Sequence, residues 1–345
     1  MKLMVDDAVW GFNKIFSEFG EVVTLPGRDI SRESLLDCDM LIVRSRTQVN
    51  QELLEGTKIS FVGSTVAGLD HIDESYLYKN NIAFSSAQGC NANAVAEYVI
   101  SALANLAHDY CFNLTEKSLG IIGVGNVGRR LDFKARQLGM TTLLNDPPRE
   151  EKEGADGYVS LENALSADIV SFHTPLTNNG PYPTHNLLGS QNFNLITEDT
   201  ILINAARGGI IDEAIWETIN TKANIIDCWE NEPSINRTLQ KSAYWSTPHI
   251  AGHSIDAKFM GSFMIYKELC KFTQKPMNSE VETLINRESM VIEEKTLHAT
   301  LNSIYSFKDD DEVISDISKF EDYRRNYPER LEWHHFKTQF DIPRK

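Results

Sequence analysis

The chain has 345 residues, of which 41% are hydrophobic, and 33 basic residues against 49 acidic ones give a net charge of −16. This length predicts two or three domains, and the negative charge excludes nucleic acid and anionic membrane surfaces as partners. The five cysteines are scattered and form no C-x-x-C pair, which argues against a disulfide framework and a thiolate zinc site. Acidic residues interrupt the first ten positions and no run of about 18 uncharged apolar residues occurs, so we expect a cytoplasmic protein without signal peptide or membrane helix.

Short apolar segments alternate with helix-length segments in residues 1–90, which predicts a parallel sheet built from βαβ units. The strands are expected at 3–5, 22–25, 40–43, 61–63 and 82–84. Because ligands bind beyond the carboxyl ends of such strands, Arg44, Ser45 and Arg46 after the third strand and Thr65 after the fourth are candidate substrate-binding residues. Two arginines around a serine predict an anion site, and a solvated basic loop is the alternative.

A glycine fingerprint follows the apolar run at residues 119–122. Gly123, Gly125 and Gly128 form a G-x-G-x-x-G pattern that opens an amphipathic segment. In a dinucleotide-binding turn the first glycine makes the tight turn, the second lets the backbone approach a pyrophosphate, and the third lets the helix pack closely on the strand. The pattern therefore predicts strand, turn and helix around a bound dinucleotide.

The residues after this turn predict which dinucleotide binds. Asn126 and Val127 begin the expected helix, whose free N–H groups favour a pyrophosphate. Asp146 ends the next strand, where a carboxylate accepts hydrogen bonds from the ribose diol and repels a 2′-phosphate. The sequence thus predicts NAD rather than NADP as the cofactor.

Further strands are expected in the second half of the chain, and each is followed by a residue whose side chain could take part in binding or catalysis. The predicted elements are a helix at 92–107, strands at 168–172, 200–203 and 224–226, and a helix at 254–272. Thr174, Arg207 and Asp227 follow the three strands, so they should meet at the same sheet edge as the cofactor. The acidic run at 309–312 is predicted to be a solvated turn.

Three residues in order after the fingerprint predict hydride-transfer chemistry. Arg207 lies in an Ala-Ala-Arg-Gly-Gly segment, whose glycines, Gly208 and Gly209, are expected to leave room for the guanidinium to bind a carboxylate through two parallel hydrogen bonds. Glu232 and His249 follow it; a histidine can take a hydroxyl proton, and a carboxylate beside it fixes its tautomer. His249 and His253 have the spacing of a helical metal pair, but Pro248 argues against a helix there, so we predict no metal.

The chain resembles the D-isomer-specific 2-hydroxyacid dehydrogenases. The resemblance rests on Gly-Val-Gly-Asn-Val-Gly-Arg-Arg at 123–130, Ile-Asn-Ala-Ala-Arg-Gly at 203–208, the acid-rich stretch at 227–233 and His-Ile-Ala-Gly at 249–252. It implies two Rossmann-like α/β lobes, doubly wound parallel sheets, with a cleft between them, and a small C-terminal dimerisation domain. It also implies active-site roles for Arg207 and Glu232, proton transfer by His249, and a substrate contact for Ser45. The implied NAD contacts are Asp146, Thr174, Ala205, Asp227 and Gly252.

Within this family, the resemblance implies a small phosphorylated 2-hydroxy acid as the substrate and a homodimer. The expected domains are a discontinuous substrate-binding domain at 1–90 and 254–285, an NAD-binding domain at 91–253 and a dimerisation domain at 286–345. Two positions at which the family contacts its substrate depart from its pattern: Val66 stands where Thr is usual, and His253, a further candidate substrate-binding residue, stands where Tyr is usual. The phosphate requires a concentrated basic site, for which the arginines at 44 and 46 or those at 324 and 325 are candidates. The alternatives are a dehydrogenase of another D-2-hydroxy acid, such as 3-phosphoglycerate, or an NAD-sensing protein that only binds.

Overall fold

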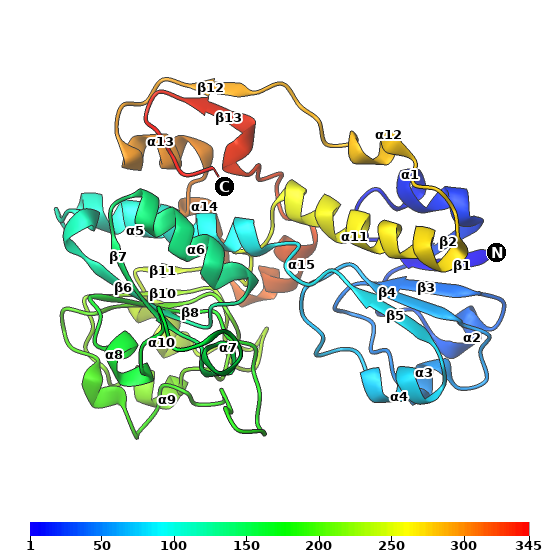
Figure 1. Ribbon diagram of the computed structural model, residues 1–345, viewed down its shortest axis with the longest axis horizontal. Helices are drawn as coiled ribbons and strands as arrows, with labels where there is room; N and C mark the ends of the chain where they lie inside the picture. Colours follow the sequence, from blue (N-terminus) through cyan, green and yellow to red (C-terminus); the bar gives the residue numbers. More distant parts are fainter. Residues whose placement is uncertain (345) are drawn as a thin grey trace. The chain divides into compact units, whose positions relative to one another are not determined.

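The computed structural model describes residues 1–344, which divide into two compact units (Figure 1). Unit 1 comprises residues 1–91 and 254–288, and unit 2 comprises residues 92–253 and the chain from residue 289 onward. The breaks after residues 91 and 253 lie close to the predicted domain boundaries. The functional roles predicted for the domains stay predictions.

Unit 1 is a five-stranded parallel sheet with helices on both faces. Its elements are β1 (Lys2–Asp6), α1 (Phe12–Phe16), β2 (Glu21–Leu25), α2 (Arg32–Leu35), β3 (Met40–Val43), α3 (Gln51–Leu54), β4 (Phe61–Ser64), α4 (Glu74–Lys79), β5 (Ala83–Ser86), α11 (Ile255–Thr273) and α12 (Ser279–Glu282), with a 3-10 turn at Ser17–Phe19. The strand order is β2-β1-β3-β4-β5, and Val43 pairs with Ser64. All five strands predicted for the first lobe are present.

Two hydrophobic clusters sandwich this sheet, as its sequence requires. The four residues of β3 are all buried, since a parallel strand covered on both faces reads as a continuous apolar run. On one face, α1 and α11 contribute Phe16, Ile265 and Leu269; on the other, α2, α3 and α4 contribute Leu35 and Leu77 among others. The return of the chain through α11 thus completes unit 1.

Unit 2 contains a six-stranded parallel sheet and the C-terminal segment. Its first elements are α5 (Ala92–Asp109), β6 (Ser118–Ile122), α6 (Asn126–Gln137), β7 (Thr141–Asn145), α7 (Pro147–Glu153), α8 (Leu161–Leu165), β8 (Ile169–Phe172), β9 (Ile201–Asn204), α9 (Glu213–Trp216), β10 (Ala223–Ile226), α10 (Arg237–Ser242) and β11 (Trp245–Ser246). The C-terminal segment adds β12 (Met290–Ile292), α13 (Leu297–Ile304), α14 (Lys308–Ile314), α15 (Phe320–Arg325) and β13 (Phe336–Thr338), and 3-10 turns lie at Leu114–Glu116, Phe193–Leu195, Ile317–Lys319 and Trp333–His335.

The order of this sheet is β11-β10-β9-β8-β6-β7, with every pair parallel. Figure 1 shows α5 and α6 on one face of it and α8, α9 and α10 on the other. The predicted fold class, with two Rossmann-like parallel sheets, is confirmed. Among residues 1–344, the helices include none long and apolar enough to cross a membrane.

The C-terminal segment builds its apolar side chains into the two cores of unit 2. Phe307 and Trp333 join the cluster that contains α5 and α6, and Ile314 and Phe320 join the cluster on the opposite face. In addition, the two guanidinium nitrogens of Arg237 donate to the carbonyls of residues 314 and 315 at 2.8 and 2.7 Å. Residues 289–344 are therefore packed as part of unit 2, and their predicted role in dimerisation stays a prediction.

A buried charged cluster fastens the end of this segment to the helices of unit 2. Lys134, which is 0% exposed, donates from Nζ to the carbonyl of Pro343 at 2.7 Å and lies 3.5 Å from Glu97. The backbone N–H of Trp333 donates to the other oxygen of Glu97 at 3.1 Å. Burial, followed by the charge of Glu332, raises the pKa of Glu97 to about 8. Glu97 therefore binds a proton more readily than an exposed glutamate does, although Lys134 and the N–H of Trp333 favour its charged form.

The acidic run at 309–312, predicted to be a solvated turn, instead belongs to helix α14. Asp310 is only 2% exposed and accepts hydrogen bonds from the hydroxyls of Tyr305, Tyr323 and Tyr327 at 2.5, 2.6 and 2.9 Å. Three tyrosine hydroxyls replace the water that such a carboxylate requires. The prediction was wrong because these partners lie up to 17 positions away in the sequence.

Candidate active site

The glycine turn between β6 and α6 has the geometry that its sequence predicts. Gly123 has φ of +91°, a conformation that side chains disfavour. A Cβ on Gly128 would lie 2.2 Å from the carbonyl oxygen of Gly123, so only glycine lets the helix pack this closely. By contrast, a Cβ on Gly125 would meet nothing within 4 Å, so space remains in front of that backbone. The turn is open at the point where a pyrophosphate would approach.

The groups around this opening fit a dinucleotide. Gly125 is the N-cap of α6 and provides no side-chain hydrogen bond, which leaves the first N–H groups, at Asn126 and Val127, for an anion. The hydroxyl of Thr174, which follows β8, is buried and finds no hydrogen-bond partner among the described residues. A buried hydroxyl of this kind is expected to bind a ligand or water. The predicted contacts of NAD with the turn and with Thr174 are thus compatible with the structure.

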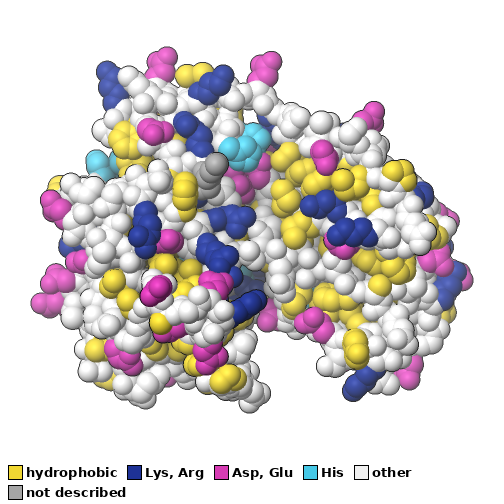
Figure 2. Space-filling model, in the orientation of Figure 1, with side chains coloured by type: hydrophobic (Ala, Val, Ile, Leu, Met, Phe, Trp, Pro, Cys, Tyr) yellow, Lys and Arg dark blue, Asp and Glu magenta, His cyan; other side chains and the backbone are white. Residues whose placement is uncertain are grey.

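Exposed basic side chains lie along the same helix. Arg129, Arg130 and Arg136 of α6 are all exposed. Figure 2 shows Lys and Arg side chains gathered over the part of unit 2 where α6 and α7 lie in Figure 1. Two of these arginines are paired with acidic side chains, because Arg129 lies 2.8 Å from Glu153 and Arg136 lies 2.6 Å from Asp132.

Asp146 follows β7, as predicted, and its carboxylate connects two neighbouring elements. One oxygen accepts the N–H of Val124 in the glycine turn at 2.8 Å, and the other accepts the N–H of Arg149 at 3.1 Å, which caps α7. Burial raises the pKa of this carboxyl above its ordinary value. The carboxylate thus holds the glycine turn against the end of β7, and its contact with the ribose of NAD stays a prediction.

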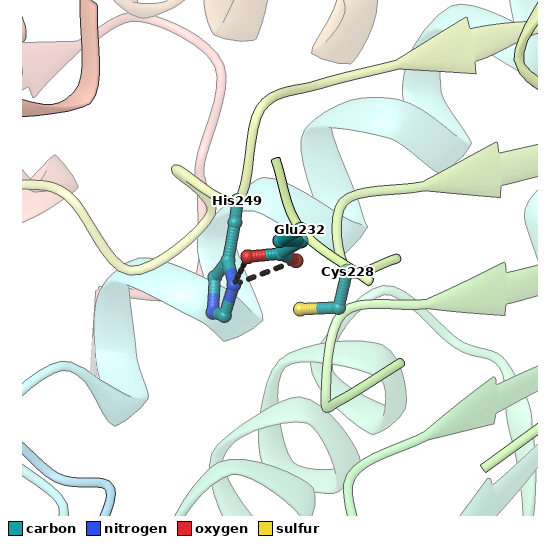
Figure 3. A group of neighbouring side chains, drawn as sticks. All are labelled: Cys228, Glu232 and His249. Atoms are coloured by element: carbon teal, nitrogen blue, oxygen red, sulfur yellow. Dashed lines mark hydrogen bonds and ion pairs between the residues drawn. The ribbon is translucent and has the colours of Figure 1, made fainter. Parts of the chain in front are cut away.

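Glu232 and His249 form the closest acid–base pair of the site (Figure 3). The Nδ1 atom of His249 lies 2.9 and 3.0 Å from the two carboxylate oxygens of Glu232. The side chains are 28% and 20% exposed, so both are partly withdrawn from water. A carboxylate at Nδ1 fixes the tautomer with its proton on that nitrogen and leaves Nε2 to accept a proton.

The surroundings of Glu232 keep its carboxylate charged. Burial alone would raise the pKa of Glu232, but His249, then Arg324 and the N–H of Trp229, hold it below its ordinary value. The Trp229 N–H donates to one oxygen at 3.0 Å, and Nη1 of Arg324, in α15, lies 3.7 Å from the other. A charged carboxylate is what the adjacent imidazole requires when it takes up a proton.

The loop that carries His249 is held by the buried carboxylate of Asp227. Asp227 is 1% exposed and accepts the N–H groups of Ile250 and Ala251 at 2.7 and 3.1 Å. It also accepts the hydroxyl of Thr247 at 2.7 Å. His249 itself has φ of +54°, a conformation that costs a non-glycine residue about 1–3 kcal/mol and so needs surrounding contacts. Asp227 therefore positions the histidine, and its predicted contact with NAD stays a prediction.

Arg207 lies in a loop that is built by Asn204 and by a glycine. The side chain of Asn204 donates to the carbonyl of Arg207 at 2.9 Å and accepts the N–H of Ala206 at 3.1 Å. A Cβ on Gly208 would lie 2.0 Å from the carbonyl oxygen of Trp229, so this glycine makes room for backbone rather than for the guanidinium. Nη1 of Arg207 donates to the Ala206 carbonyl at 2.8 Å, and Arg207 also acts electrostatically on the thiol of Cys228.

Cys228 joins Glu232 and His249 in a group whose possible ligand atoms all lie within 4.8 Å of one another (Figure 3). Burial, together with the carboxylates of Asp227 and Glu232, raises the pKa of the Cys228 thiol well above its ordinary value. Because the thiolate rather than the thiol binds metals, this group lacks one strong ligand. The prediction that the site holds no metal stays a prediction.

The substrate-binding residues predicted in unit 1 lie at the ends of two neighbouring strands. Arg44, Ser45 and Arg46 follow β3, and Thr65 follows β4, which pairs with it. Arg44 donates to the carbonyl of Ala8 at 3.3 Å. Thr65 is 7% exposed, and its hydroxyl donates to the Val43 carbonyl at 3.3 Å. Thr65 is thus used within the fold, whereas Ser45 is exposed.

Three other predicted site residues lie in the same part of unit 2 as the pair. Ala205 is buried just after β9, and Gly252 and His253 follow the His249 loop. The ring of His253 contacts the ring of Tyr327 edge to face, with centroids 5.5 Å apart. Tyr327, which belongs to the C-terminal segment, therefore lies beside the predicted site residue His253.

Sequence reasoning missed several residues that complete the site. Tyr98, on the buried face of α5, has its hydroxyl 2.7 Å from that of Thr247. Arg330 donates to the carbonyl of Ala251, next to the His249 loop. Tyr98 has the spacing of an ordinary core residue, and Arg330 lies in a segment far from the motifs, so neither carried a local signal.

The fold and this site together define a D-2-hydroxyacid dehydrogenase. A family model described as "D-isomer specific 2-hydroxyacid dehydrogenase, NAD binding domain" matches residues 95–251. A solved structure of NAD+-bound 3-phosphoglycerate dehydrogenase from Entamoeba histolytica is similar in fold, with a TM-score of 0.64, 24% identity, and coverage of 83% of this chain and 99% of that one. The predicted cofactor, NAD, and the predicted class of enzyme are confirmed.

Curated relatives identify the family more narrowly. An erythronate-4-phosphate dehydrogenase of Ruthia magnifica subsp. Calyptogena magnifica is 56% identical over 343 residues, covering 99% of both chains. One of Hydrogenovibrio crunogenus is 50% identical, covering 96% of this chain and 92% of the relative. The chain belongs to the erythronate-4-phosphate dehydrogenase family.

Proposed function

We propose that the protein oxidises 4-phospho-D-erythronate at C2 to (R)-3-hydroxy-2-oxo-4-phosphooxybutanoate, a step of pyridoxal 5′-phosphate (vitamin B6) biosynthesis. The name of relatives that match 96 to 99% of the chain supports this substrate. The observation that carries the chemistry is the Glu232–His249 pair, with 2.9 Å between Nδ1 and the carboxylate, in the unit that bears the glycine turn.

In this reaction, bound NAD supplies the acceptor for the hydride that leaves C2. His249 takes the proton of the C2 hydroxyl at Nε2, because Glu232 occupies Nδ1. The negative charge of Glu232 stabilises the imidazolium that forms. Arg207 holds the substrate carboxylate through its planar guanidinium and so orients C2. One C–H and one O–H bond break, and the carbonyl of the 2-oxo acid forms.

We also propose that the protein is a cytoplasmic homodimer. The support for dimerisation is the short sheet of the C-terminal segment, in which β12 pairs with β13 and exposes Met290 and Val291 by 43 and 69%. Apolar side chains this exposed favour burial against another protein surface. Sedimentation equilibrium at micromolar concentration measures the oligomeric state, and a monomeric mass would contradict the dimer.

The function is tested by following NADH absorbance with a panel of 4-phospho-D-erythronate, 3-phosphoglycerate and D-lactate. The highest kcat/KM is expected with 4-phospho-D-erythronate. A higher kcat/KM with 3-phosphoglycerate would mean that 3-phosphoglycerate, and not 4-phospho-D-erythronate, is the substrate. Calorimetric binding of NAD without turnover of any panel member would instead favour the non-catalytic binding protein.

A further inference from the structure

Arg324 brings a second guanidinium of unit 2 to the acid–base pair. It is the fifth residue of α15, and its side chain is 17% exposed. An ion pair joins its Nη1 to Glu232 at 3.7 Å, which is longer than a hydrogen bond. Its Nε atom is buried and has no hydrogen-bond partner within residues 1–344. A guanidinium has five N–H donors, so Arg324 retains most of its binding capacity.

Neighbouring arginines of unit 2 are used differently. Arg237 donates to the carbonyls of Ile314 and Ser315 at 2.8 and 2.7 Å, and Arg330 donates to the carbonyl of Ala251. Both therefore stabilise the backbone of unit 2, although Nη1 of Arg330 is also buried without a hydrogen-bond partner among residues 1–344. Arg324 makes no such backbone contact with the part of the chain that the structure describes, and an arginine withdrawn from water with unused donors indicates an anion that binds there.

The helix around Arg324 is fixed in place before any ligand arrives. Phe320, one turn earlier, is fully buried, and its ring lies 5.6 Å from the guanidinium carbon. Tyr323 is anchored to Asp310 through its hydroxyl at 2.6 Å. A guanidinium on a fixed helix loses less conformational freedom on binding, so it is suited to a specific contact.

The charge of the proposed substrate calls for two cationic sites. A phosphorylated hydroxy acid carries a carboxylate at one end and a phosphate with a charge of about −1.5 to −2 at the other. Arg324 lies 3.7 Å from Glu232, and both Arg207 and Arg324 act electrostatically on Cys228, which lies beside Glu232 and His249, so both cations lie near the acid–base pair. One guanidinium serves the carboxylate, and the second remains for the other anionic group.

We propose that Arg324 binds the terminal phosphate of the substrate and so makes the C-terminal segment the part of the chain that selects phosphorylated hydroxy acids. This inference rests on the proposed function. It distinguishes Arg324 from Arg44 and Arg46, which follow β3 in unit 1.

The test compares wild type with Arg324→Gln, Arg324→Lys and a matched control, Lys319→Gln, which removes a basic side chain that is 66% exposed in the same segment. Values of kcat/KM are measured for 4-phospho-D-erythronate and for D-erythronate, which lacks the phosphate. Loss of a charge-assisted contact should lower kcat/KM for the phosphorylated substrate about 10- to 150-fold in Arg324→Gln. Activity on D-erythronate should fall by a much smaller factor, which reflects only the loss of the charge that Arg324 places beside Glu232. Arg324→Lys should be intermediate, because lysine keeps the charge but not the fork of donors.

Calorimetric NAD binding and the melting temperature show whether each variant is folded. If Arg324→Gln lowers both substrates equally and moves the pH–rate profile, Arg324 acts on Glu232 and the inference is overturned. Unchanged kcat/KM for the phosphorylated substrate overturns it as well. If wild type oxidises no phosphorylated acid at all, the proposed function fails, and the inference fails with it.

Discussion

The hydroxyl of Thr247 links Tyr98 to the carboxylate that holds the His249 loop. Thr247 donates to Asp227 at 2.7 Å, so Tyr98, whose hydroxyl is 2.7 Å away, must be the donor to Thr247. Burial and then the charge of Asp227 raise the pKa of Tyr98 well above its ordinary value, which keeps this hydroxyl protonated. The three side chains are only 0 to 1% exposed, so water cannot replace a missing partner. Thr247→Val keeps the shape of the side chain and removes both hydrogen bonds.

The contacts give the size of the effect. Losing a hydrogen bond to a charged group costs about 1.5–3 kcal/mol, and leaving the Tyr98 hydroxyl without a partner costs about 1–3 kcal/mol. Thr247→Val should therefore lower the free energy of unfolding by about 2.5–6 kcal/mol, against about 0.5–1.5 kcal/mol for Tyr98→Phe. In the double variant no hydroxyl is left unpaired, so it should be more stable than Thr247→Val alone by about 1–3 kcal/mol.

Urea denaturation of the four proteins measures this cycle, and NADH formation measures turnover. We expect stability to recover in the double variant while turnover stays low, because Asp227 still lacks the hydrogen bond from residue 247. Additive losses of stability in the double variant would refute the pairing of Tyr98 with Thr247.

Three further predictions follow from the site and from the buried cluster. His249→Ala should lower kcat about 10²- to 10⁴-fold by loss of the general base, while calorimetry should show unchanged NAD affinity. Turnover above about a tenth of wild type in this variant would assign proton transfer to another residue. Glu232→Gln should shift the pH–rate profile, because it removes the charge that favours the imidazolium. NAD should bind at least about tenfold tighter than NADP, and Asp146→Ala should narrow this gap in calorimetry; equal wild-type affinities would contradict the role of Asp146. The pKa of Glu97 rises from an ordinary 4.5 to about 8 in the folded protein. The contribution of the protonated carboxyl to the free energy of unfolding is therefore fully present below pH 4.5 and is lost as the pH rises through 8. Glu97→Gln copies the protonated form and should become more stable relative to wild type over this interval, whereas parallel curves of unfolding free energy against pH would exclude the proton on Glu97.

The elements that the sequence predicts well are those with local causes. A buried parallel strand is largely apolar, so β3 is visible as a continuous apolar run, and β9 is visible as the apolar run 201–203 before its final Asn204. The function of Gly128 was also predictable, because close packing of a helix on the preceding turn leaves no space for a side chain. The order Arg207, Glu232, His249 pointed to a site because each residue follows the end of a parallel strand.

The rest depends on contacts between distant segments. The buried state of Asp310 needs hydroxyls from three tyrosines, and the sequence alone cannot show that they converge. The role of Gly208 was predicted incorrectly because its neighbour, the backbone of Trp229, lies on another strand-end loop. Likewise, the sequence leaves Arg324 as one of four candidate arginines for the phosphate, and only the fold places it beside Glu232.

The hydrogen bond from Lys134 to the carbonyl of Pro343 has a consequence for folding during synthesis. These residues are 209 positions apart, so at a synthesis rate of about 5–20 residues per second the lysine waits about 10–40 s for its acceptor. During that interval the face of α5 that Trp333 later covers is exposed on the nascent chain. The His249 loop should likewise acquire the contact of Ala251 with Arg330 only after a further 79 residues have been added to the chain.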